Sequence, residues 1–160
     1  MGKSGLLEAF EEFDGIRTEP LKKVLGGCVS SDVLPFIPGP HEIPATWFLL
    51  KLAKAGSVSL RDAEVAAQRL PQIQSADAVL HVLQMAQHLP DAYANSKTAI
   101  APLLEHKRIL IRVWALDALV RADPAAPELI GLIDNAAKDS SAAMRARARQ
   151  LMPLLVKTIG

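Results

Sequence analysis

Val113-x-Ala115-Leu116-x-Ala118-Leu119 is one of four similar stretches whose first residues are numbered 47, 80, 113 and 146, which is a constant spacing of 33 residues. The others are Trp47-x-Leu49-Leu50-x-Leu52-Ala53, Leu80-x-Val82-Leu83-x-Met85-Ala86 and Ala146-x-Ala148-Arg149-x-Leu151-Met152. A fixed period of roughly 20–50 residues is typical of stacked copies of one supersecondary unit. The spacing therefore predicts a repeat architecture, but it does not by itself predict a function.

The composition favours an all-α fold in one domain spanning 1–160. Half of the 160 residues are apolar but only 4% are aromatic, so Leu, Ala, Val and Ile must form most of the core. Leu and Ala are strong helix formers, and strand-like alternation is nearly absent. The net charge of +1 gives the whole molecule no field that would attract polyanions, so any such surface has to be local.

Capping residues and prolines divide the chain into helical segments. We expect helices over 4–14, 20–25, 44–55, 59–70, 75–89, 95–105, 107–122, 124–138 and 141–156. Gly56 is expected to cap one helix, and Asp123-Pro124 to open another. Pro102 is expected to bend its helix, and Pro153 to kink or end the last one.

The segment 28–43 cannot form one helix, because Pro35, Pro38 and Pro40 interrupt it. We expect at most one short helical turn there. Its apolar residues, among them Phe36 and Ile37, predict that it packs against the core, and the same two residues are candidates for contact with a partner. A connection of this length in a compact domain is either functional or a wrapping segment.

The stretch 95–156 resembles a HEAT-like repeat of the short bacterial type, as found in phycobilin-lyase-like proteins. The resemblance rests on Ala99-Ile100-Ala101-Pro102-Leu103-Leu104 with Ile111-Arg112-x-x-Ala115-x-x-Ala118-Leu119, and on Asp139-x-x-x-x-Met144-Arg145-x-x-Ala148-x-x-Leu151-Met152. In that family an Asp in the turn and an Arg on the second helix form a ladder between repeats. Asp139 and Arg145 match this pattern, whereas His106 stands where an Asp would accompany Arg112.

The resemblance implies an α-solenoid of about four helix pairs, with 44–157 as the repeats and 1–43 as an irregular cap and loop. HEAT-like repeats usually bind or scaffold proteins, although a minority attach bilins to phycobiliproteins or flip damaged bases out of DNA. The resemblance covers 44–94 less well and does not extend before residue 44.

The helix 107–122 is apolar on opposite faces, which is typical of a helix buried between neighbours. At matched positions of the last helix, Arg147 replaces Trp114 and Arg149 replaces Leu116. Because terminal repeats need a polar outer face, we predict that Arg147 and Arg149 belong to a solvated C-terminal cap.

Arg145, Arg147 and Arg149, with Lys138 and Lys157 nearby, form the densest basic cluster of the chain. One interpretation is a phosphate- or nucleic-acid-binding patch. The other is a solvated cap plus one ladder arginine, which the absence of interleaved aromatic residues favours.

No pattern in the sequence predicts catalysis, a cofactor or a metal. His81, His88 and His106 lack the close spacing and the number of ligands that a zinc site requires. Cys28 is the only cysteine, and no nucleophile or phosphate-loop motif occurs. We interpret Trp47 and Trp114 as packing residues and Glu8, Glu11 and Glu12 as a solvated face.

These observations favour a non-catalytic module that binds a partner protein through the helical-repeat surface. The alternative is nucleic-acid binding through the arginine-rich face of the last helix, with an enzyme as a third hypothesis. A homodimer through the apolar faces is also open. The beginning of the chain lacks an apolar signal core and no apolar run could span a membrane, so we expect a cytoplasmic protein without membrane contact.

Overall fold

A computed structural model describes residues 3–159, and all the regular structure in this range is helical. The α-helices are α1 (Lys3–Glu12), α2 (Glu19–Leu25), α3 (Ser30–Val33), α4 (Glu42–Lys54), α5 (Leu60–Gln68), α6 (Ala76–Met85), α7 (Lys97–Ile100), α8 (Ile109–Ala122), α9 (Glu128–Ala137) and α10 (Ala142–Ile159). Short 3₁₀ helices are η1 (Leu34–Phe36), η2 (Leu70–Gln72), η3 (Pro90–Tyr93) and η4 (Ala101–Glu105). The predicted all-α class is confirmed.

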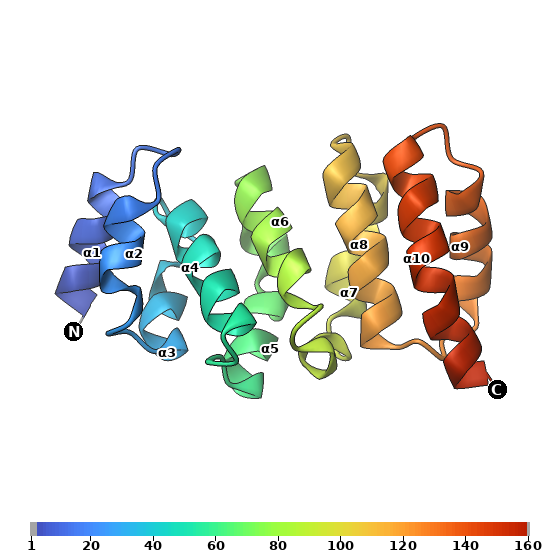
Figure 1. The fold of residues 1–160 in the computed structure, drawn as a ribbon, viewed down its shortest axis with the longest axis horizontal. Coiled ribbons are helices and arrows are strands. Elements are labelled where there is room, and N and C mark those ends of the chain that lie inside the picture. The colour runs from blue at the N-terminus through green and yellow to red at the C-terminus, as the bar shows by residue number, and fades with distance from the viewer. Residues whose placement is uncertain (1–2, 160) are drawn as a thin grey trace.

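Four helices, α4, α6, α8 and α10, pack side by side in chain order and are called the row below. Figure 1 shows them following one another along the long axis, with α1 and α10 at opposite ends. Each of the last three row helices also packs against the helix before it, α5 on α6, α7 on α8 and α9 on α10, while α2 packs on α4. The row therefore places residues 33 positions apart on neighbouring helices.

Several helix boundaries follow the local sequence. Gly56 ends α4 with a φ of +73°, and the amide of Ser57 donates to the carbonyl of Leu52 over 2.8 Å, as in a glycine C-cap. The Ser59 side chain accepts from the amide of Asp62 at the start of α5. The expected helix 95–105 breaks into α7 and η4 one residue before Pro102, because proline has no amide hydrogen to donate.

The predicted start of the helix 124–138 is wrong. Asp123-Pro124 forms a turn after α8, and α9 begins only at Glu128, behind a second proline, Pro127. The Asp123 carboxylate does not cap α9, since it accepts from the Lys97 ammonium over 2.7 Å. Of the two prolines, Pro127 and not Pro124 therefore marks the start of the helix.

Pro153 was predicted to kink or end the last helix, and it does not end it, because α10 runs through it to Ile159. Pro153 lacks the hydrogen bond to the carbonyl of Arg149, and both residues lie on the exposed side of α10. Water can therefore hydrate the freed carbonyl, and the helix continues.

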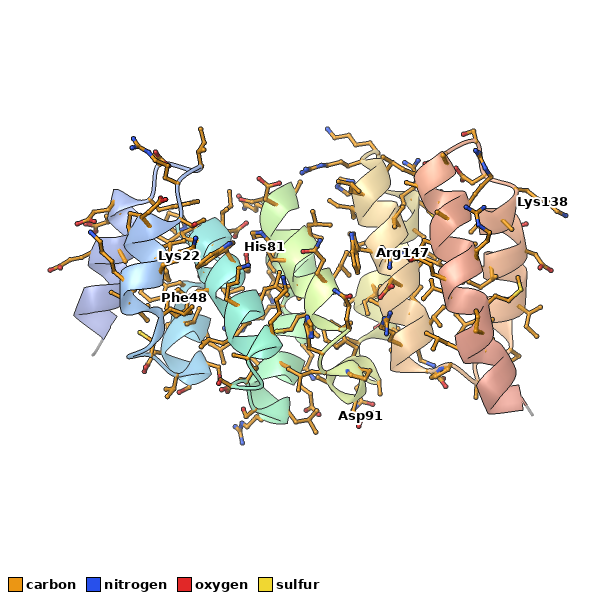
Figure 2. The ribbon with its side chains drawn as sticks, in the orientation of Figure 1. Lys22, Phe48, His81, Asp91, Lys138 and Arg147 are labelled. Atoms are coloured by element: carbon orange, nitrogen blue, oxygen red, sulfur yellow. The ribbon has the colours of Figure 1, made fainter. Side chains whose placement is uncertain are left out.

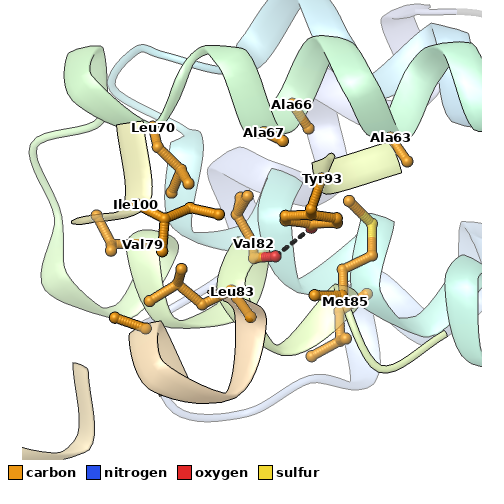
Figure 3. Close-up of a cluster of buried hydrophobic side chains, with 14 of the residues drawn as sticks. Ala63, Ala66, Ala67, Leu70, Val79, Val82, Leu83, Met85, Tyr93 and Ile100 are labelled. Atoms are coloured by element: carbon orange, nitrogen blue, oxygen red, sulfur yellow. Dashed lines mark hydrogen bonds between the residues drawn. The ribbon is translucent and has the colours of Figure 1, made fainter. Parts of the chain in front are cut away.

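The core runs through the row, and α8 is buried on two sides. Both predicted apolar faces of this helix are buried, Ile111 and Ala115 on one and Val113 and Leu116 on the other. Between α5 and α6 the small residues Ala63, Ala66 and Ala67 allow close approach, and larger side chains from α6 fill the space beside them (Figure 3). Alternating small and large residues are how a chain poor in aromatics reaches close packing.

Tyr93 caps the end of α6 from inside the core. Its hydroxyl donates to the carbonyl of Val82, whose ordinary helical partner, the amide of Ala86, bonds instead to Leu83 (Figure 3). Burial raises the pKa of Tyr93, so the phenol stays a donor. We expect Tyr93→Phe to lower the unfolding free energy by about 2 kcal/mol, because it leaves a buried carbonyl unpaired.

Urea denaturation followed by circular dichroism would measure this loss, with Tyr93→Leu as a comparison that also removes ring volume. A Tyr93→Phe variant as stable as the original chain would contradict the capping role.

Candidate interaction face

The solvent side of the row carries two half-buried tryptophans, each beneath a cation. The Lys51 ammonium lies 5.5 Å from the centre of the Trp47 ring on α4. The Arg147 guanidinium of α10 lies 4.3 Å from the centre of the Trp114 ring of α8. Cation–π contacts of this kind hold both partners in place. Both tryptophans pack against the core, which confirms their predicted packing role, and each keeps part of its surface open.

Asp117 lies at the centre of a polar cluster between α8 and α10, which we call the Asp117 clasp (Trp114, Asp117, Arg121 and Arg147). The Asp117 carboxylate is fully buried and accepts from Arg121 Nε over 2.7 Å and from an Arg147 Nη over 3.1 Å. The arginine side chains are 29% and 20% exposed. Two cations thus neutralise one buried anion and leave one surplus positive charge.

The prediction that Arg147 belongs to a solvated cap is therefore wrong. The buried Asp117 one helix away turns this residue inward, and Figure 2 places Arg147 between α8 and α10. Arg149 is exposed, as predicted. The side chain of Lys157 lies outside the described part of the structure, and Lys138 is exposed directly after α9.

Arg145 and Arg112, which are 33 residues apart, make equivalent contacts. Arg145 donates to the main-chain carbonyls of Asp139 and Ser140 over 2.8 and 3.0 Å, and Arg112 to those of His106 and Lys107 over 2.7 and 3.3 Å. Each arginine thus binds the turn that precedes its own helix. The predicted pairing of the Arg145 and Asp139 side chains is wrong, because Arg145 donates to main-chain carbonyls and not to the Asp139 carboxylate.

His106 takes the place of an aspartate in the earlier turn. The Asp139 carboxylate accepts from the amide of Ser141 over 2.8 Å, and His106 Nδ1 accepts from the amide of Arg108 over 3.0 Å. Both acceptors lie two residues before the donor, so one unprotonated ring nitrogen performs the role of a carboxylate oxygen. His106 thus differs from the aspartate of the repeat pattern but forms the same hydrogen-bonded turn.

His81 joins α4 to α6. Its Nδ1 lies 2.9 Å from the hydroxyl of the buried Thr46, and burial lowers its pKa to about 4, helped by Lys51 and opposed by Asp77. Figure 2 shows His81 between the two helices. Within residues 3–159 no three His, Cys, Asp or Glu side chains come together to hold a metal ion.

Glu42 is a buried carboxylate that ties the proline-rich turn to the start of α6. One oxygen accepts from the amide of Gly39 over 3.1 Å, and the other from those of Gln74 and Ser75 over 2.9 and 2.6 Å. Burial acts to raise the pKa of Glu42, but the hydrogen bonds from Ser75, Gly39 and Gln74 outweigh it and lower the pKa. The open groove beside Glu42, about 550 Å³ in volume, thus has its most polar group already satisfied.

The segment 28–43 packs against the molecule, as its apolar residues predict. Arg69 donates to the carbonyls of Leu34 and Ile37, both over 2.8 Å, and Phe36 packs edge-on against Phe10 with ring centres 5.0 Å apart. Ile37 is buried, which corrects its assignment as a partner contact, and Phe36 is half-buried. Burial and Asp32 raise the pKa of the Cys28 thiol, which disfavours a nucleophilic role.

Three lysines that the sequence interpretation did not single out lie together at the start of the row. Burial and the positive charges of Lys54 and Lys22 lower the pKa of Lys51. Farther along, burial and the charges of Lys54 and Arg121 lower the pKa of His88. Positive charge thus lies on α2, α4 and α8, on both sides of α6, which carries no Lys or Arg. The signal in the sequence was the i, i+3 pair Lys51 and Lys54 on a helix otherwise buried.

Comparison with protein families, curated proteins and solved structures finds no match for this chain. None of the helices described between residues 3 and 159 combines the length and the apolar character that a membrane crossing needs.

Proposed function

We propose that this chain is a HEAT-like α-solenoid without catalytic activity that binds a partner protein through the solvent side of the row. The observation that carries this proposal is the half-open placement of Trp47 on α4 and Trp114 on α8, the two helices that flank α6 in the row. Tryptophan is enriched among residues that dominate binding energy, and rigid helices hold such anchors at low entropic cost.

The repeated contacts support the solenoid part of the proposal. Arg112 and Arg145 bind their turns in the same way, and His106 and Asp139 accept equivalent amides. The side-by-side order of the row is that of stacked helix pairs. Proteins of this kind use an extended helix face for binding.

Nucleic-acid binding through the arginines of the last helix has less support in the structure than in the sequence. Of its three arginines, Arg145 is bound to a turn and Arg147 to Asp117, so only Arg149 remains exposed. A single exposed arginine contributes little to phosphate binding.

Site-specific photocrosslinking tests the protein-binding proposal. We expect p-benzoylphenylalanine in place of Trp47 to form a light-dependent adduct with another protein in cells that express the chain naturally. The matched control carries the same group in place of Ile130, which is 51% exposed on α9 outside the row. Equal adducts from both positions, or none from position 47, would contradict the proposal. An adduct of twice the chain's mass would assign the face to a second copy instead.

A further inference from the structure

Charge is segregated between the row and the helices outside it. Between residues 5 and 155, the row carries seven basic residues: Lys51, Lys54, Arg112, Arg121, Arg145, Arg147 and Arg149. Its three acidic residues are Glu42, Asp77 and Asp117, and only Asp77 is exposed. The helices α1, α5 and α9 carry the reverse balance over the same range, with Arg61 against Glu8, Glu11, Glu12, Asp62, Glu64, Glu128 and Asp134. The small net charge of the chain thus conceals a basic face.

Four side chains form what we call the cationic track: Lys22 on α2, Lys51 and Lys54 on α4, and Arg121 on α8. Lys22, Lys51 and Lys54 have no carboxylate partner among the described residues, while Arg121 shares Asp117 with Arg147. Lys51 feels the charges of both other lysines, and His88 lies where it feels both Lys54 and Arg121. Because α2 packs on α4, and α6 packs on both α4 and α8, the four cations lie along one continuous run of packed helices.

Trp47 supplies an apolar floor beside the lysines, since it lies beneath Lys51 on the same helix. A ligand that suits this surface carries several negative charges and an apolar group that can reach the indole. Uncompensated cations held next to one another repel, and an anion laid across them relieves that repulsion.

We infer that the partner presents an acidic peptide segment with an apolar side chain, which lies along the cationic track and contacts Trp47. This inference rests on the proposed function and specifies its partner. Carboxylates of such a segment pair with Lys22, Lys51, Lys54 and Arg121, and electrostatic attraction speeds the encounter.

A single-stranded nucleic acid fits the same charges less well. Bases bind by stacking on open aromatic faces. Here Lys51 lies over one face of Trp47, and Arg147, held by the buried Asp117, lies over one face of Trp114, so a base cannot stack on those faces. An apolar side chain needs only the part of the Trp47 indole that is left exposed. Phosphate groups also bind well at helix N-termini, where main-chain amides are free. The row presents the sides of its helices to a ligand and not these ends.

Selection from a library of random 16-residue peptides on the immobilised full chain tests the inference. We expect enriched peptides to be rich in Asp and Glu with at least one large apolar residue. A triple variant, Lys22→Gln, Lys51→Gln and Lys54→Gln, should bind them roughly tenfold more weakly, because each exposed charge pair contributes modestly. The control, Arg61→Gln, Lys107→Gln and Lys138→Gln, removes equal charge from exposed sites outside the track and should bind within about twofold.

The outcomes separate the two proposals. Enriched peptides without acidic character that still require Trp47 would overturn the acidic partner and leave protein binding standing. If the enriched peptides bind the Trp47→Ala variant and the triple lysine variant as tightly as the original chain, both the acidic partner and the proposed binding face are overturned. A twenty-residue oligothymidylate that binds more tightly than the peptides, and weakens in the lysine variant, would assign the track to nucleic acid. Both triple variants should match the original chain in thermal unfolding, which excludes misfolding as the cause.

Discussion

Replacement of Asp117 by alanine is expected to lower the unfolding free energy by about 3 kcal/mol. The carboxylate is fully buried and neutralises Arg121 and Arg147, so its removal leaves two partly buried cations facing each other. Removing one partner of a buried ion pair costs roughly 3–5 kcal/mol, and the partial exposure of both arginines places this case at the low end. Urea denaturation at pH 7 measures the loss.

Three further variants identify the cause of this loss. Arg149→Ala removes an exposed guanidinium from α10, the helix that carries Arg147, and should change stability by less than about 0.5 kcal/mol. The cycle of Asp117→Ala and Arg147→Ala should give a coupling energy of about 1–3 kcal/mol, because the two residues share one cluster. Additive effects, or an Asp117→Ala variant as stable as Arg149→Ala, would show that the clasp does not join α8 to α10.

The helices were largely predictable because their apolar faces repeat and their ends carry local signals. Gly56 and Ser59 act within a few residues of their own helices, so their effect could be derived from neighbouring sequence. The start of α9 could not, since Asp123 has an acceptor role toward Lys97, which lies 26 positions earlier. Local capping rules fail when a distant side chain competes for the cap.

The Asp117 clasp could not be predicted from local sequence either, because it depends on a side chain that is distant in the chain. Comparison of Arg147 with Trp114 at matched positions suggested a change from buried to solvated, but it ignored the neighbour across the helix interface. Asp117 was the available signal: it is the one charged residue between Val113 and Val120, and a charge inside such a run has to be paired. Arg121, one turn later, gave one partner, and only the packing of α10 on α8 brings Arg147 as the second.

The unfolding free energy should fall by about 2 kcal/mol between pH 7 and pH 5 because of His81 alone. Burial lowers the pKa of this histidine from 6.5 to about 4 in the folded chain, helped by Lys51 and opposed by Asp77. Between these values the unfolded chain binds a proton that the folded chain does not. Stability therefore rises with pH through this window and is lost as the solution is acidified, up to about 3 kcal/mol at pH 4.

His81→Gln isolates this effect, because glutamine is neutral throughout and its amide can still bond to Thr46. The difference in unfolding free energy between the original chain and this variant, measured by urea denaturation at pH 7, 6 and 5, should shrink with acidification by about 2 kcal/mol. The range ends at pH 5 because the stabilisation from Glu42, whose pKa lies below 4.5 in the fold, is lost only at lower pH. His88→Gln replaces an exposed histidine in the turn after α6; it is the control and should leave most of the slope in place. A difference that does not change with pH would mean that His81 takes up its proton inside the fold, and that the contact with Thr46 does not require a neutral ring.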